Sequence, residues 1–117
     1  MNEVPLFSSL NIKSITLRNR IVLSPMCQYK AKDGMISDWH LQHYSRFAFS
    51  GLGAAFIEAT GVSPEGRIGH GCTGIWSDDH IEGLSKIAKT FKEYNCVSGI
   101  QLAHAGRKAS FLRPWDG

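Results

Sequence analysis

Apolar residues along this chain form short continuous runs, and longer stretches with a three- and four-residue apolar spacing separate them. The runs at 21–23, 54–60 and 97–102 have the length and composition of short buried strands. Helical spacing of apolar residues appears from 39 to 52 and from 81 to 91. The pattern therefore predicts the order strand, helix, strand, helix, strand.

Local signals fix the expected ends of these elements. Ser37 suits the N-cap of the first helix, and Ser77 opens the second, with acidic residues in both first turns. Gly51 and Gly53 are expected to end the first helix. The predicted buried stripes are Leu41, Tyr44, Phe47, Ala48 and Leu52 in the first helix, and Ile81, Leu84, Ile87, Ala88 and Phe91 in the second. The segment 12–18 is expected to form a hairpin below the sheet, and 63–74 a polar connection.

Strands joined through helices predict an α/β fold with a parallel sheet. No G-x-G-x-x-G follows a strand, so a dinucleotide-binding Rossmann site lacks its fingerprint. The other main parallel architecture is the (β/α)8 TIM barrel, whose active site lies at the carboxyl ends of the strands. Three segments fall at that position, 24–29, 58–61 and 101–107, and we expect them to meet at one rim.

Composition excludes several classes of protein. The chain has 13 Lys and Arg against 10 Asp and Glu, and these charges are scattered, which argues against a nucleic-acid surface. No apolar stretch approaches the roughly 20 residues of a membrane span. The amino terminus lacks signal-peptide features, so a cytoplasmic location is expected. The 3 cysteines have no CxxC spacing, which predicts reduced thiols without a disulfide framework or zinc site.

Four ordered motifs make the chain resemble the old yellow enzyme family, in its thermophilic-like or xenobiotic-reductase-like branch. They are Leu17–Tyr29 (LRNRIVLSPMCQY), Gly74–His80 (GIWSDDH), Gln101–Ala109 (QLAHAGRKA) and Arg113–Gly117 (RPWDG). The resemblance implies that residues 1–117 are the amino-terminal β/α units of an FMN-binding TIM barrel. It also implies an oxidoreductase in which NADPH or NADH reduces the flavin, and the flavin reduces an activated alkene such as an enone.

The resemblance assigns residues to the cofactor and the substrate. Ser24, Pro25, Met26 and Cys27 match the segment along the flavin ring, where the Cys27 thiol would tune the flavin potential. Ala59 matches a position close to the ring. Gln101 matches an amide that hydrogen-bonds the pyrimidine edge of the flavin, and Tyr29 matches a position that borders the substrate.

Outside the motifs the residues have simpler interpretations. Cys27 alone would be a buried structural cysteine, and Tyr29 a half-buried core residue. His104, Arg107 and Lys108 are not assigned to catalysis, and no catalytic residue is assigned in this chain. His40 and His43 have the spacing of a metal pair on a helix, but without a third ligand they are expected on a solvated helix face, so no metal site is predicted.

The family's carbonyl-binding pair and phosphate-binding loops have no counterpart before Gly117. We therefore expect little turnover from this chain alone and an incomplete barrel with open strand edges. Three hypotheses remain: part of an FMN-dependent ene-reductase, a noncatalytic barrel remnant that forms homo-oligomers or binds a partner through those edges, and an unrelated small α/β binding module. Retained flavin would favour the first, and a colourless oligomer the second.

Overall fold

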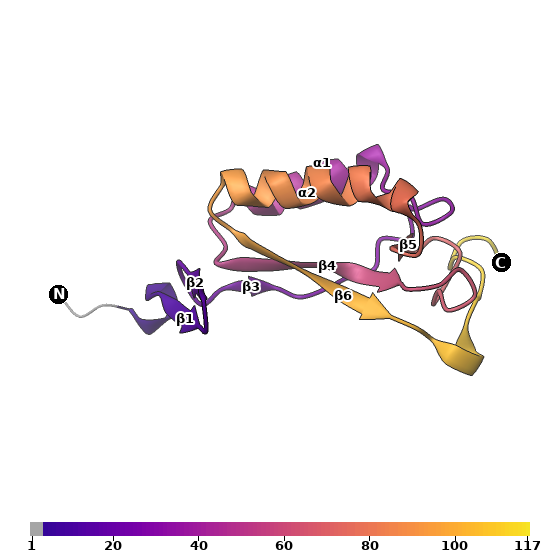
Figure 1. Ribbon diagram of the computed structural model, residues 1–117, viewed down its shortest axis with the longest axis horizontal. Coiled ribbons are helices and arrows are strands. Elements are labelled where there is room, and N and C mark those ends of the chain that lie inside the picture. Colours follow the sequence, from indigo (N-terminus) through magenta and orange to yellow (C-terminus); the bar gives the residue numbers. More distant parts are fainter. Residues whose placement is uncertain (1–3) are drawn as a thin grey trace.

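A sheet and two helices form two layers in the computed structural model, which describes residues 4–117. Both helices lie on the same side of the sheet, and the opposite side is bare (Figure 1). In a complete TIM barrel the helices form the outer ring and the other face of the sheet lines the interior. The bare face is therefore the one that corresponds to a barrel interior.

The parallel sheet is built around one central strand, β4 (Ala54–Gly61). Strand β6 (Val97–Ala103) pairs with it along its whole length. On the other edge, β3 (Val22–Leu23) pairs with the start of β4 and β5 (Thr73–Gly74) with its end. The order strand, helix, strand, helix, strand is confirmed. Strand β5 was expected to be part of a polar connection, because two residues are too few to show a periodicity.

The helices are α1 (Asp38–Ala48) and α2 (Ile81–Glu93), the second preceded by a 3-10 turn, η2 (Asp78–His80). A separate hairpin of β1 (Leu10–Ile12) and β2 (Ile15–Leu17) precedes the sheet, as the sequence predicts. Short 3-10 turns also occur at η1 (Pro5–Phe7) and η3 (Gly106–Lys108).

The hydrophobic core lies between the helices and the sheet. Its buried members are Tyr44, Ala48, Ala55, Ile57, Ile87, Phe91 and Cys96. Two residues of the predicted buried stripes do not lie where the sequence pattern placed them. Leu52 lies beyond the end of α1, although it packs against the core, and Ile81 is 57% exposed at the first position of α2. Helical spacing continues past the end of α1 to Leu52, and it includes Ile81 in the exposed first turn of α2, so periodicity alone misplaced both residues.

None of the helices within residues 4–117 is long and apolar enough to cross a membrane.

Candidate functional site

A β-bulge at Glu58 decides which side chains face the bare side of the sheet. Residues directly opposite on paired strands point to the same face. Ile57 pairs with Ile100, and both pack on the helix side, whereas the next pair is Ala59 with Gln101. Glu58 therefore has no partner residue in β6. Without the bulge Glu58 would pair with Gln101 and point away from the helices, so the extra residue turns Ala59 to the bare face.

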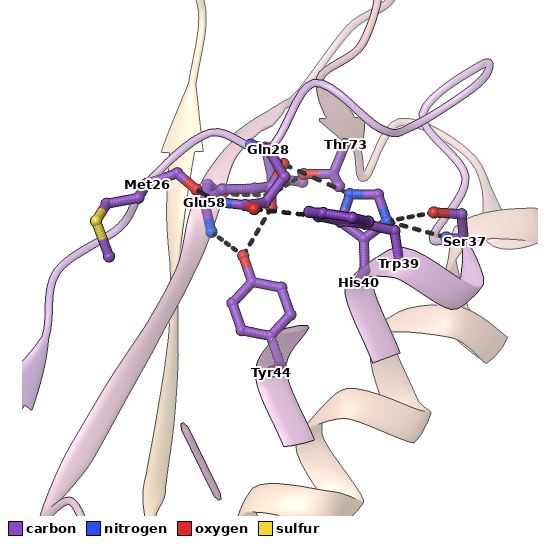
Figure 2. Close-up of polar contacts among 9 residues, drawn as sticks. Met26, Gln28, Ser37, Trp39, His40, Tyr44, Glu58 and Thr73 are labelled. Atoms are coloured by element: carbon purple, nitrogen blue, oxygen red, sulfur yellow. Dashed lines mark hydrogen bonds and ion pairs between the residues drawn. The ribbon is translucent and has the colours of Figure 1, made fainter. Parts of the chain in front are cut away.

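Glu58 is completely buried and is held by side chains from α1 (Figure 2). The Tyr44 hydroxyl donates to Glu58 Oε2 at 2.8 Å and accepts from the Glu58 backbone N–H at 2.9 Å. Burial, and then the negative charge of Glu58, raise the pKa of Tyr44. One hydroxyl therefore satisfies both the side chain and the backbone of the bulged residue.

His40 is the second buried side chain beside Glu58. Its Nδ1 accepts the Ser37 backbone N–H at 3.0 Å, so the ring hydrogen lies on Nε2. Nε2 faces Glu58 Oε1 at 3.6 Å, which is longer than a hydrogen bond. The expectation that His40 lies on a solvated helix face is wrong, because the side chain is fully buried between α1 and the sheet. His43, on the same helix, is only partly buried.

Glu58 also anchors the segment that follows β3. The backbone N–H of Gln28 donates to Glu58 Oε1 at 3.2 Å. The Gln28 side chain bridges onward, since its amide nitrogen donates to the Met26 carbonyl and its amide oxygen accepts from Trp39 Nε1. The Met26 side chain points away from this cluster and is 47% exposed (Figure 2). The hydrogen bonds of Glu58 and Gln28 thus hold the backbone of 26–28 and leave the Met26 side chain free.

The pKa values of Cys27 and Cys72 shift in opposite directions. A side-chain hydrogen bond with Cys72 raises the pKa of Cys27, and burial raises it further. The same hydrogen bond lowers the pKa of Cys72 to about 6, and the backbone amides of Gly69 and Ile68 add to the effect. A backbone hydrogen bond from Ala59 reaches Cys27. Cys27 therefore lies against the rim of β4, as its position after β3 predicts.

Tyr29 lies at the outer end of the same segment. Its backbone has a positive φ of 57°, and its ring meets the Trp115 ring edge-on at 6.0 Å. The Ala31 N–H donates to the Gly71 carbonyl at 3.0 Å just beyond it. The contact between the Tyr29 and Trp115 rings places the motif at 113–117 against the motif at 17–29.

Comparison with known proteins agrees with this geometry. Residues 5–113 match the model of the NADH:flavin oxidoreductase / NADH oxidase family. The chain belongs to that family. It is 50% identical over 111 residues to the NADPH dehydrogenase of Geobacillus thermodenitrificans, covering 93% of this chain and 32% of that protein. It is also 50% identical over 106 residues to the NADPH dehydrogenase of Bacillus subtilis, covering 89% and 31%.

Solved structures of flavin oxidoreductases superpose well on this chain. The old yellow enzyme of Trypanosoma cruzi matches with a TM-score of 0.80 and 32% identity, over 90% of this chain and 28% of that one. Morphinone reductase in complex with tetrahydroNAD matches with a TM-score of 0.81 and 25% identity, over 92% and 29%. The chain has the fold of the amino-terminal β/α units of a TIM barrel, and it spans about a third of the length of these family relatives.

The predicted rim residues of this family member lie near one another. Ala59 and Gln101 are paired neighbours, and the backbone of 26–28 is tied to Glu58 in the same strand as Ala59. Sequence reasoning missed the buried support behind them: Glu58, Tyr44, His40 and Cys72. The sequence contained one signal of this buried support, because a glutamate inside an otherwise apolar strand needs buried partners. The sequence did not show which residues supply them.

Proposed function

We propose that this chain supplies the rim of the first three barrel strands to an FMN-dependent ene-reductase. NADPH or NADH would be the reductant and an activated alkene the substrate. The observation that carries the proposal is the bulge at Glu58, which turns Ala59 and Gln101 together toward the side of the sheet without helices. Family membership supports the flavin as the group that this rim holds.

The residues at this rim suit a flat aromatic ring. Ala59 is 4% exposed and offers no bulk beyond its methyl group, and Met26, after the end of β3, offers an exposed, polarizable side chain. Gln101 is exposed and makes no hydrogen bond to another of the described residues, so its amide is free to pair with a ring edge. An amide, a thioether and a small side chain together fit an isoalloxazine ring.

Each of the rim residues would then have its own role in binding the flavin or the substrate. The Gln101 amide would hydrogen-bond the pyrimidine edge of the flavin, and the backbone of Ser24 and Pro25 would lie along the ring. The Cys27 thiol would contact the ring and adjust its potential. Tyr29 would offer its hydroxyl to the substrate carbonyl. When bound, the flavin supplies hydride transfer, while these residues orient the ring and the substrate.

Reassembly with the rest of a relative tests the proposal. The 117-residue chain is co-expressed with the part of the Bacillus subtilis NADPH dehydrogenase that follows the matched region. The enzyme's own matched region serves as the control in the same split arrangement. We expect both pairs to co-purify with flavin and to reduce an enone with NADPH. A control pair that retains flavin beside a colourless pair containing this chain would refute the proposal.

A second proposal rests on the open strand edge. Strand β6 pairs only with β4 among the strands of the described chain, so its other edge is free to bind another strand. Phe56 on the bare face is 40% exposed, and a Cβ on its neighbour Gly99 would lie only 2.6 Å from the Phe56 ring. We infer that the isolated chain forms homo-oligomers through this edge. Sedimentation of a monomer across a hundredfold range of concentration would contradict this.

The proposal also covers domain and location. Residues 1–117 would act as one structural unit of the barrel, and the protein would be cytoplasmic. Its 3 free cysteines support a reducing compartment. Fractionation of the source cells, with the chain followed by an antibody, tests the location.

A further inference from the structure

Glu58 is a fully buried carboxyl group, and both of its oxygens face hydrogen-bond donors (Figure 2). Oε2 accepts from the Tyr44 hydroxyl at 2.8 Å, and Oε1 accepts from the Gln28 backbone N–H at 3.2 Å. The Tyr44 oxygen itself accepts the Glu58 backbone N–H, so the hydroxyl hydrogen is directed at the carboxyl group. A protonated carboxyl group would need an acceptor for its own hydrogen, which these donors do not offer. The hydrogen bonds therefore favour the ionised carboxylate.

His40 places a third donor beside the same carboxyl group. Both helices follow a Ser-x-x-His turn, in which histidine Nδ1 accepts the serine backbone N–H and Nε2 keeps the ring hydrogen. In the second turn, His80 Nε2 reaches the Asp33 carbonyl oxygen at 3.0 Å. The buried His40 Nε2 has no hydrogen-bond partner within residues 4–117, and it faces Glu58 Oε1 at 3.6 Å. An N–H aimed at an oxygen in this way stabilises a negative charge on it.

No cation neutralises the Glu58 carboxylate in the part of the chain that the structure describes. The Lys and Arg ion pairs of residues 4–117 do not include Glu58, and the nearby His40 ring has its hydrogen on one nitrogen only. A buried carboxylate without an opposite charge is costly, so its presence indicates a functional role. The charge also reaches the rim: the hydrogen bond with Cys72 and burial raise the pKa of Cys27 most, and the negative charge of Glu58 raises it further.

We propose that the buried Glu58 carboxylate makes the flavin harder to reduce, and therefore makes the reduced flavin a stronger hydride donor. This inference rests on the proposed function. Glu58 directly precedes Ala59 at the rim, and it holds the backbone of 26–28, the segment assigned to the ring. Reduction adds electrons to the ring, and a fixed negative charge behind the rim opposes that gain. Because Glu58 points toward α1, it is a positioning residue that acts through its charge and not by contact.

Flavin potentials of the reassembled barrel test the effect of this charge. Glu58→Gln removes the charge with little change in size, whereas Glu58→Asp keeps the charge and shortens the reach to Tyr44 and Gln28. Glu93→Gln removes an exposed carboxylate at the end of α2 and serves as the matched control. We expect Glu58→Gln to raise the potential by about 30 mV, which is about a tenfold change in the equilibrium constant of a two-electron couple. The other two variants should move it much less.

A second measurement needs no flavin and no substitution. The carboxyl ¹³C resonance of Glu58 in the 117-residue chain, assigned through bonds from its own backbone, reports whether the group is ionised. We expect a carboxylate at pH 7. A carboxylic acid at that pH would overturn the proposal, and this result is obtained even if Glu58→Gln does not fold.

The remaining outcomes separate this inference from the proposed function. A rise in potential that Glu58→Asp matches would reveal a purely structural effect, and a potential that Glu58→Gln leaves unchanged would show no effect of the charge. Either result would overturn the inference while the flavin-containing unsubstituted pair still supports the proposed function. A colourless unsubstituted pair beside a yellow control pair would refute the proposed function, and this inference with it.

Discussion

Replacing Tyr44 by Phe removes one hydroxyl that makes two hydrogen bonds at the bulge. The ring stays, and Phe fits the same space between α1 and the sheet. Glu58 Oε2 then loses the donor at 2.8 Å, and the buried Glu58 backbone N–H loses its acceptor at 2.9 Å. The Gln28 N–H at 3.2 Å remains on the other carboxyl oxygen. Two polar groups are therefore left buried without a partner.

The magnitude follows from the cost of each unsatisfied group. A buried polar group without a partner costs about 1–3 kcal/mol, so two such groups cost about 2–6 kcal/mol in the free energy of unfolding. That is a large share of the roughly 5–15 kcal/mol that stabilises a typical domain. Tyr94→Phe is the matched control, because Tyr94 is 44% exposed and its hydroxyl makes no hydrogen bond to another described residue.

Urea unfolding followed by circular dichroism measures the difference, and hydrogen exchange of the Glu58 amide locates it. We expect a loss of about 2–6 kcal/mol for Tyr44→Phe, near zero for Tyr94→Phe, and faster exchange at Glu58. In a Glu58→Met background the same change should cost less, because only the backbone N–H remains to be orphaned. Equal stability of Tyr44→Phe and Tyr94→Phe would refute the reasoning about the bulge.

Three further predictions concern the rim. The Cys72 pKa of about 6 lies below the ordinary thiol value of 9.0, so its contribution to stability is present above pH 9 and is lost as the pH falls toward 6. Urea unfolding should show a free energy of unfolding that rises between pH 6 and 9, and Cys72→Ser should lack this rise; equal rises in both proteins would contradict it. Cys27→Ala should raise the Cys72 pKa, whereas Cys27→Ser should keep it low because the hydroxyl still donates, as followed by the ultraviolet absorbance of the thiolate. In the reassembled barrel Gln101→Leu should weaken flavin retention about tenfold or more, since a paired amide is lost, while Gln42→Leu on the exposed face of α1 should not; equal retention in the two variants would remove Gln101 from the site.

Much of the architecture followed from local patterns. The serines before each helix, the glycines after α1 and the short apolar runs predicted the order of elements, and those signals act within a few residues of one another. The four motifs then predicted the family, which the comparisons confirm. The prediction that Ile81 is buried was wrong for a physical reason. Ile81 keeps the helical spacing, but it lies in the exposed first turn of α2.

The candidate site divides between sequence and tertiary structure. Local patterns were enough to predict that Met26, Ala59 and Gln101 follow or end buried strands, because strand-forming runs are local. Long-range contacts were needed to show that the bulge turns Glu58 to Tyr44 and His40 and leaves Ala59 beside Gln101. The hydrogen bond between Cys27 and Cys72 also joins distant parts of the chain. Register shifts and side-chain partners depend on contacts between residues 14 to 45 positions apart, and a linear pattern does not encode which of these contacts form.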